Sequence, residues 1–300
     1  MPNHITIVGQ TGQLASALVR LCEARNIEFR ALSRHDLDLS ANAEQITSVL
    51  ETLEPTDVII IAAAYTAVDA AEEDLETAIA VNGDAPKTIA NFCNAKNIPL
   101  IHVSTDYVFD GTADTPYIPD SALSPINSYG YSKLLGEQHV LESGANAAIF
   151  RTSWVYDGTG KNFLTTMLRL AKTRDTLGVV SDQIGRPTYA GHLAQSILNA
   201  CEVAHSNPSS IAGIYHLTGT GAPASWADFA REIFQQASEH LDGVPKVNNI
   251  LASEYPTPAK RPNFSVLNMD SYVEKFAYPM PNWQLGVSDA IEEWVEAKNN

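Results

Sequence analysis

The first half of the chain alternates short apolar runs with longer segments in which apolar residues recur every three or four positions. The short runs are typical of strands, and the recurrence is typical of amphipathic helices. The run at 57–63 is apolar after its first residue, which indicates a strand buried on both faces. The expected strands are residues 5–8, 28–32, 57–63, 99–104 and 147–152, and the expected helices are 13–24, 46–53, 69–95 and a segment ending near 142. This alternation predicts an α/β fold with a doubly wound parallel sheet.

Beyond residue 152 the regular alternation of strands and helices stops. Helical patterns near 163–172, 191–203, 225–237 and 288–297 are separated by short strands and by loops that contain Pro and Gly. No flexible linker marks the change. We therefore predict a first domain at 1–152 and a smaller α/β domain at 153–300, with some segments of the second packing back on the first and a cleft between them.

Composition and charge narrow the class of protein. The 300 residues are 45% hydrophobic and 18% charged, a balance typical of a globular chain. A net charge of −16 repels nucleic acid and anionic membrane, so neither is expected as a partner. We find no apolar run of membrane-spanning length, no secretory leader pattern, and only three widely spaced cysteines. These features predict a cytoplasmic protein with reduced thiols.

A glycine-containing segment, Gly9-Gln10-Thr11-Gly12-Gln13-Leu14-Ala15, joins the first expected strand to the first expected helix. Glycines there let the backbone approach a pyrophosphate, and the helix N-terminus offers free N–H groups and a positive dipole end. The pattern GxxGxxA departs from the common GxGxxG fingerprint, and a plain strand-to-helix turn stays an open interpretation. Because the segment opens a βαβ series, we predict that residues 1–152 form a Rossmann-like dinucleotide-binding domain.

The end of the second expected strand bears on which dinucleotide binds. An acidic residue there would bind the ribose hydroxyls of NAD, whereas a basic one favours the 2′-phosphate of NADP. The sequence reads Leu32-Ser33-Arg34-His35, with no carboxylate before Asp36. Ser33 and Arg34 therefore favour NADPH, with NADH as the alternative; a solvated loop arginine is an equally open interpretation.

A candidate proton-transfer group lies in Tyr129-Gly130-Tyr131-Ser132-Lys133, the one Y-x-x-x-K of the chain. Residues 125–128 offer helix caps, which places Tyr129 and Lys133 on one face of a helix. An ammonium beside a phenol favours the phenolate and brings its pKa toward neutral pH. Thr105 follows the strand at 99–104, at the edge of the sheet where ligands of such folds bind. Together with the glycine loop, these residues form the reactive set of a short-chain dehydrogenase.

Several longer sequence segments identify a protein family more specifically than these short motifs do. They are residues 62–69 (AAAYTAVD), 104–109 (STDYVF), 151–156 (RTSWVY), 160–163 (GKNF), 182–188 (DQIGRPT), 255–262 (YPTPAKRP) and 283–286 (WQLG). In these strings, and over nearly its whole length, the chain resembles the dTDP-4-dehydrorhamnose reductases, a family of extended short-chain dehydrogenases. The resemblance implies that NADPH or NADH reduces the 4-keto group of dTDP-4-dehydro-L-rhamnose to dTDP-L-rhamnose. It also implies that residues 153–300 mainly bind the substrate.

The resemblance further implies roles for single residues. Thr105 would orient the sugar carbonyl, Tyr129 would donate the proton, and Lys133 would tune Tyr129 and hold the nicotinamide ribose. Besides Ser33, Arg34, Tyr129 and Lys133, the implied cofactor contacts are Gly9, Gly12, Gln13, Leu14, Asp38, Leu39, Ala62, Ala63, Ala64 and Tyr65. The implied substrate contacts are Val68, Thr105, Tyr107 and Trp154, with Arg186, Lys260 and Arg261 as candidates for the substrate's diphosphate. An indole face also suits the apolar side of a deoxysugar.

One departure from the family concerns metal. Some members dimerise around Mg²⁺ through carboxylates at two positions that hold Ala17 and Gly191 here. Neither residue supplies a carboxylate oxygen. We therefore predict no metal site, and a monomer or weak homodimer.

Two rival functions stay open. One is a nucleotide-sugar epimerase or 4,6-dehydratase of the same group, although such dehydratases carry Asp-Glu after the Thr and this chain has Asp106-Tyr107. The other is a non-catalytic NADP-binding regulatory subunit, which the intact set of Thr105, Tyr129 and Lys133 disfavours. The sequence also leaves open the nucleotide of the substrate and the stereochemistry of the product alcohol.

Overall fold

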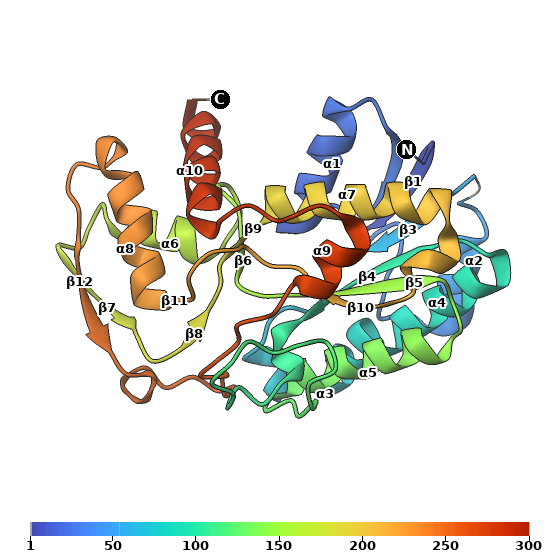
Figure 1. The fold of residues 1–300 in the computed structure, drawn as a ribbon, viewed down its shortest axis with the longest axis horizontal. Helices are drawn as coiled ribbons and strands as arrows, with labels where there is room; N and C mark the ends of the chain where they lie inside the picture. Colours follow the sequence, from blue (N-terminus) through green and yellow to red (C-terminus); the bar gives the residue numbers. More distant parts are fainter. Residues whose placement is uncertain (1, 54, 300) are drawn as a thin grey trace.

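The computed structural model describes residues 2–53 and 55–299. Its centre is a sheet in the order β2-β1-β3-β4-β5-β10, in which every neighbouring pair is parallel (Figure 1). The strands are β1 (His4–Val8), β2 (Glu28–Leu32), β3 (Val58–Ile61), β4 (Leu100–Thr105), β5 (Ala147–Thr152) and β10 (Gly213–His216). The predicted α/β class with a doubly wound, Rossmann-like sheet is confirmed.

Helices cover both faces of this sheet (Figure 1). The helices of one face are α1 (Gln13–Ala24), α7 (Ala190–Ser206) and α9 (Asp270–Phe276), and those of the other are α2 (Ala43–Leu50), α4 (Ala85–Lys96) and α5 (Ser128–Glu142). Side-chain alternation along β3 sends Val58 and Ile60 into the first apolar cluster and Ile59 and Ile61 into the second. This double burial explains the continuous apolar run in the sequence.

The helical region expected at 69–95 is interrupted in the structure. A 3₁₀ turn at 70–72 is followed by α3 (Leu75–Ile79), which Asp74 caps through the N–H of Thr77. A π-helical turn over Ala80–Asp84 then leads into α4. The apolar periodicity runs through all of these pieces, so it gave no sign of the breaks.

Two helix starts also differ from the prediction. α2 begins at Ala43 instead of 46, because Asn42 and Gln45 form a capping box that fixes its first turn. α10 (Trp283–Asn299) begins well before 288. Gly286 does not break this helix. Its missing side chain allows close packing, since a Cβ there would lie 2.8 Å from the Tyr156 hydroxyl.

Residues beyond 152 build a third apolar cluster around α6 (Phe163–Leu170), α8 (Trp226–Gln236) and α10. Short strand pairs accompany it: β7 (Thr176–Val180) with β12 (Lys246–Ile250), β8 (Ile184–Gly185) with β11 (Ala224–Ser225), and β6 (Val155–Tyr156) with β9 (Thr188–Tyr189). β10, α7 and α9 belong to the same half of the sequence but pack with the central sheet (Figure 1). The division at residue 152 stays a prediction.

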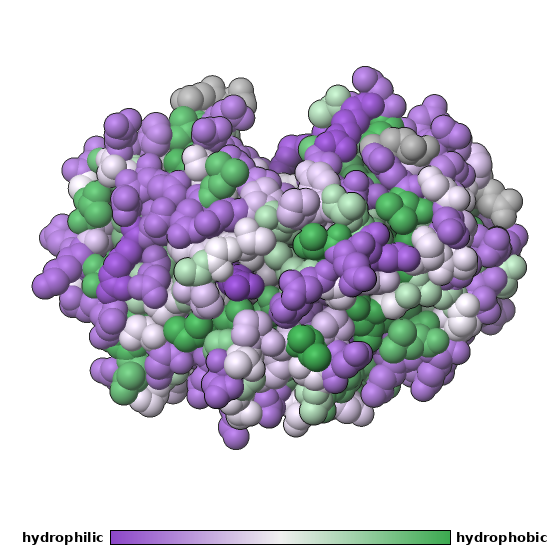
Figure 2. Space-filling model, viewed as in Figure 1, coloured by the Kyte–Doolittle hydropathy of each residue, from purple (hydrophilic) through white to green (hydrophobic). Residues whose placement is uncertain are grey.

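The surface of the molecule is mainly hydrophilic on the face shown in Figure 2. Figure 2 shows hydrophilic residues over most of the face in view, with apolar residues in scattered groups. Among the described residues, no helix is both long enough and apolar enough to cross a membrane. Cys22, Cys93 and Cys201 are buried free thiols.

Candidate active site

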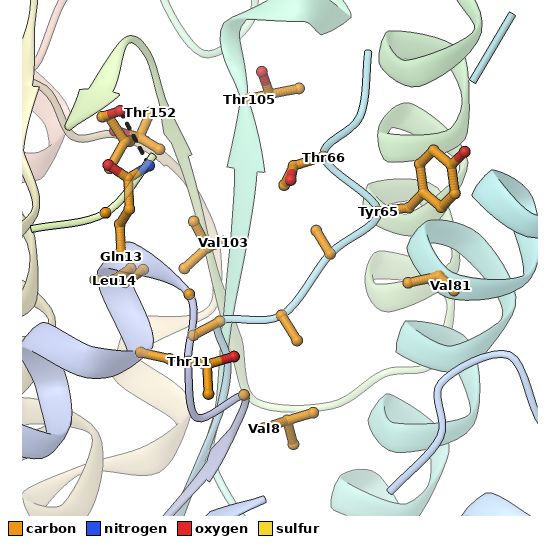
Figure 3. Close-up of a pocket in the computed structure, with 18 of the residues that line it drawn as sticks. Val8, Thr11, Gln13, Leu14, Tyr65, Thr66, Val81, Val103, Thr105 and Thr152 are labelled. Atoms are coloured by element: carbon orange, nitrogen blue, oxygen red, sulfur yellow. Dashed lines mark hydrogen bonds between the residues drawn. The ribbon is translucent and has the colours of Figure 1, made fainter. Parts of the chain in front are cut away.

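The carboxyl ends of β1, β3 and β4 open onto one cavity of about 1120 Å³. The strand order reverses at β1, since β2 lies on one side of it and β3 and β4 on the other, and doubly wound sheets bind ligands at such a point. Figure 3 looks into this cavity, with Thr11, Tyr65 and Thr105 among its walls. Every predicted cofactor residue lines it: Gly9, Gly12, Gln13, Leu14, Ser33, Arg34, Asp38, Leu39, Ala62, Ala63, Ala64, Tyr65, Tyr129 and Lys133.

The turn between β1 and α1 is shaped to present backbone N–H groups to an anion. Gly9 has a φ of +125°, and a Cβ there would lie 3.2 Å from the backbone nitrogen of Ala63. Both facts favour glycine. Gly12 caps α1, and a Cβ there would meet no described atom within 4 Å, so its backbone is open to the cavity. The first turn of α1 contains no acidic residue, which leaves its positive dipole end uncompensated. This cradle fits a pyrophosphate.

The loop at 157–162 lies against the start of α1. Gln13 donates from Nε2 to the carbonyl of Val155 at 3.4 Å, the dashed line in Figure 3, and its Oε1 is buried without a partner among the described residues. Asp157 accepts the N–H of Gly160 at 2.5 Å and orders the loop. Lys161 lines the cavity from this loop. Our sequence reasoning missed Lys161 as a site residue, although the helix cap that follows it was a usable signal.

The loop after β2 presents Arg34 to the cavity. Its side chain is 80% exposed, and its Nε lies 3.9 Å from Oδ1 of Asp38, so the guanidinium makes no close pair with that carboxylate. Ser33 instead donates its hydroxyl to Asp36 at 2.6 Å, and this bond lowers the pKa of Asp36. An exposed guanidinium fits a 2′-phosphate, whereas the hydroxyl proton of Ser33 is already in use.

The segment after β3 is held by Asn82, a buried residue of the π-helical turn that our sequence reasoning missed. Its Oδ1 accepts the N–H of Tyr65 at 2.8 Å, and its Nδ2 donates to the Tyr65 carbonyl at 3.0 Å. The same Nδ2 donates to Ser132 Oγ on α5, also at 3.0 Å. One amide therefore ties the Ala62–Tyr65 wall of the cavity to the helix that carries Tyr129.

The structure brings Thr105, Tyr129 and Lys133 together on one side of the cavity. Thr105 ends β4, and α5 begins just before Tyr129 because Asn127 caps it, as predicted. The Thr105 hydroxyl lies close enough to that of Tyr129 to influence its pKa. Lys133 is only 2% exposed, and its Nζ donates to the carbonyl of Val103 at 2.8 Å.

Burial dominates the electrostatics of this group. It raises the pKa of Tyr129 to about 12, outweighing the neighbouring Thr105 hydroxyl, which acts to lower it. Burial lowers the pKa of Lys133 to about 8, although the charge of Glu137 acts in the opposite direction. The expectation that the Tyr129 pKa falls toward neutral pH is therefore wrong in this structure, because desolvation of the phenolate raises the pKa and the charge of Asp106 raises it further.

A buried ion pair lies beneath these residues. Arg151 of β5 donates to Glu137 of α5 from Nε at 2.9 Å and from Nη2 at 2.7 Å, and the side chains are 0% and 1% exposed. Ser104 Oγ donates to the same carboxylate at 2.5 Å, and Arg151 Nη1 donates to the carbonyl of Pro119 at 2.9 Å. The pair thus joins β4, β5 and α5, the elements that hold Thr105 and Lys133.

An aromatic wall faces the cavity from the second half of the chain. The rings of Trp154 and Trp226 stack with centroids 3.6 Å apart and planes 8° apart, and both line the cavity with Val68 and Tyr107. Trp154 has a φ of +50°, a strained value for a bulky residue. Trp226 was missed by our sequence reasoning, because the string around it indicated only a helix cap, which Ser225 does provide.

The three cations predicted for the substrate's diphosphate do not line this cavity. Arg261 pairs with Asp69 through Nη2 at 2.8 Å and Nη1 at 3.0 Å. Arg186 donates to the carbonyls of Gly221 and Leu267, both at 3.0 Å, and Lys260 is exposed. Their role at the substrate's diphosphate therefore stays a prediction, and Lys161 is a cation that does line this cavity.

Ala17 and Gly191 occupy the positions at which some family members carry carboxylates for Mg²⁺, and both lie in closely packed surroundings. Ala17 is 2% exposed within α1, and a Cβ on Gly191 would lie 2.4 Å from the Tyr189 ring. Within the part of the chain that the structure describes, no group of three or more His, Cys, Asp or Glu side chains is arranged to hold a metal ion.

A dinucleotide cradle at the switch point of a parallel sheet, with threonine, tyrosine and lysine facing it, defines a Rossmann-fold oxidoreductase of the short-chain dehydrogenase class. Comparison with known proteins narrows the class. Residues 3–296 match the family described as the RmlD substrate binding domain. The chain is 41% identical to the dTDP-4-dehydrorhamnose reductase of Escherichia coli K12 over 298 residues, covering 97% of each chain. It is also 41% identical to that of Sinorhizobium fredii over 283 residues, covering 94% of each.

A solved structure supports the same assignment. The dTDP-4-dehydrorhamnose reductase of Bacillus anthracis, in complex with NADP, superimposes with a TM-score of 0.89 at 33% identity, covering 98% of this chain and 100% of that one. The chain belongs to the dTDP-4-dehydrorhamnose reductase family.

Proposed function

We propose that this chain reduces the 4-keto group of dTDP-4-dehydro-L-rhamnose to dTDP-L-rhamnose with NADPH. The observation that carries the proposal is the shared cavity, in which the Gly9–Gly12 turn lies with Thr105, Tyr129 and Lys133. The names of the family relatives support the substrate. Tyr107 follows Asp106 where a dehydratase needs a second carboxylate, which argues against that rival.

NADPH supplies the hydride for the ketone carbon when it is bound. Gly9, Gly12 and the N–H groups of the first turn of α1 would hold its pyrophosphate, and Arg34 its 2′-phosphate. Ala62 to Tyr65 would contact its middle part, held in place by Asn82.

Tyr129 donates the proton. Its raised pKa, about 12, keeps the hydroxyl protonated until the ketone oxygen gains negative charge and becomes the stronger base. Thr105 beside it bonds that oxygen and fixes its position. Lys133, with a pKa of about 8, is mostly cationic at neutral pH and stabilises the phenolate that remains after proton donation.

Substrate recognition is proposed for the part of the cavity that Trp154 and Trp226 line. The stacked indoles of Trp154 and Trp226 present apolar surface suited to the methyl side of a 6-deoxysugar. Lys161 is proposed to neutralise a diphosphate, since it reaches the cavity from a loop next to α1.

The direct test mixes the protein with NADPH and dTDP-4-dehydro-L-rhamnose and follows the absorbance of the reduced nicotinamide. We expect oxidation that depends on the sugar nucleotide. We also expect Tyr129→Phe to lower kcat by about 10³-fold while the affinity for NADPH is retained. Tight NADPH binding without oxidation would favour the regulatory-subunit alternative. Purification with NAD bound and no net oxidation would favour an epimerase or dehydratase. A panel of 4-keto sugar nucleotides, with product stereochemistry from NMR, identifies the preferred substrate.

We also propose that the protein is cytoplasmic and is a monomer or weak homodimer without a bridging metal. The residues at the two relevant positions, Ala17 and Gly191, carry no carboxylate. Light scattering with and without EDTA checks this: the mass should not change on chelation, and a dimer that dissociates in EDTA would contradict it.

A further inference from the structure

The single hydroxyl proton of Thr105 is already in use in this structure. Oγ1 of Thr105 donates to Oδ1 of Asp106 at 3.0 Å and accepts the backbone N–H of Tyr107 at 3.2 Å. A hydroxyl that donates to a carboxylate has no second proton to offer. In this arrangement Thr105 cannot donate to a ketone oxygen, although the proposed function requires that bond.

Asp106 has the surroundings of a neutral acid. Its side chain is 3% exposed and lines the cavity, and Oδ2 is buried without a well-formed hydrogen bond to any described residue. A buried carboxylate oxygen without a donor is costly, and a proton on the carboxyl group removes most of that cost. Burial raises the pKa of Asp106 to about 7, although the hydroxyls of Ser265 and Thr105 act to lower it.

We propose that Asp106 is a positioning residue that acts in its protonated form, donating to Thr105 so that Thr105 can donate its own proton to the ketone oxygen. The inference rests on the proposed function. Protonation reverses one existing hydrogen bond without requiring a heavy atom to move. The two lone pairs of Thr105 then accept from Asp106 and from the N–H of Tyr107. The proton on Asp106 comes from solvent and is not consumed, because Tyr129 still supplies the proton of the reaction.

The neighbours of Asp106 agree with this role. The titratable groups that face it are the phenols of Tyr107 and Tyr129, and a charged Asp106 raises the pKa of both. Arg261 and Asp69 lie near Tyr107 but pair with each other at 2.8 Å, so their charges largely cancel. A neutral Asp106 therefore also leaves Tyr129 the stronger proton donor.

The pH dependence of kcat tests the proposal. As the pH rises through about 7, Asp106 ionises and Thr105 loses its donor role, so kcat should fall by about 10²-fold, the usual cost of one donor to a developing oxyanion. Asp106→Asn retains a donor but cannot ionise. The fall in kcat near pH 7, the limb assigned to Asp106, should therefore disappear in this variant. A separate fall in kcat near pH 8 should remain, because Lys133 loses its proton there. Ser265→Ala removes a neighbouring hydroxyl that acts to lower the Asp106 pKa, so the fall in kcat assigned to Asp106 should move to higher pH.

Infrared difference spectra between the wild type and Asp106→Asn, recorded without sugar nucleotide, read the protonation of Asp106 directly. We expect a carboxylic acid band at about pH 6 that is replaced by a carboxylate band above about pH 8. Asp110→Asn is the matched control, because hydrogen bonds from Thr112 and Tyr117 lower the pKa of Asp110 and it should show only carboxylate.

Three results would overturn the proposal: a carboxylate band for Asp106 at every pH, a limb that persists in Asp106→Asn, or a limb that Ser265→Ala leaves in place. Failure of the proposed function is distinguishable, since it would appear as no NADPH oxidation at any pH while the infrared titration of Asp106 remained readable.

Discussion

Replacing Glu137 with glutamine tests whether the buried ion pair with Arg151 stabilises the packing of β4, β5 and α5, the elements that carry Thr105 and Lys133. Glu137 is 1% exposed and Arg151 0%, and the carboxylate accepts from Nε and Nη2 of Arg151 and from Ser104. Removing one partner of such a pair costs about 3–5 kcal/mol, because the other charge stays buried without compensation. Glutamine keeps one acceptor oxygen for Arg151 or Ser104. We therefore expect the low end of that range, about 3 kcal/mol of unfolding free energy.

Urea unfolding followed by tryptophan fluorescence measures this loss. The matched control is Arg231→Ala, which breaks an exposed ion pair with Asp228 whose side chains are 43% and 57% exposed. Exposed pairs contribute at most about 1 kcal/mol, so the control should unfold nearly as the wild type does. If Glu137→Gln loses no more stability than the control, the buried pair does not hold β4, β5 and α5 together as argued here.

Other substitutions probe the cofactor and diphosphate sites. Arg34→Ala should raise the KM for NADPH about tenfold and leave the KM for NADH unchanged, since only NADPH carries a 2′-phosphate; equal shifts would contradict the assignment. Gly9→Ala should abolish NADPH binding in a fluorescence titration, because it strains a φ of +125° and crowds Ala63, whereas Gly243→Ala, with nothing within 4 Å, should bind normally. Lys161→Ala should raise the KM of NADPH or of the nucleotide sugar about tenfold, and Lys260→Ala should change neither; unchanged KM values in Lys161→Ala would remove that residue from the site.

The fold could be predicted from the sequence because its signals are local. The continuous apolar run at 57–63 indicated a strand buried on both faces, and the structure divides its residues between two apolar clusters. Asn127 was identifiable as part of a helix cap before Tyr129, and it caps α5. The glycine turn follows β1, as its position in the βαβ series indicated.

The features that could not be predicted depend on contacts between distant parts of the chain. Asn82 bonds the cavity wall at Tyr65 from a π-helical turn that the apolar periodicity did not reveal. Trp226 stacks on Trp154, which is distant from it in the sequence, and Arg261 pairs with Asp69 across 192 positions of sequence. The Tyr129 pKa likewise follows from burial, which a four-residue spacing to Lys133 does not reveal.

The most direct test of the central claim, that Tyr129 protonates a ketone held at Thr105, uses NADPH deuterated at carbon 4 of the nicotinamide on the face that is transferred. Mass spectrometry and NMR of the product locate the label. The account predicts one deuterium on carbon 4 of the sugar with the wild type, and product formation slower by about 10³-fold with Tyr129→Phe at unchanged NADPH affinity. A product without deuterium at that carbon, or a Tyr129→Phe variant that forms labelled product at the wild-type rate, would contradict it.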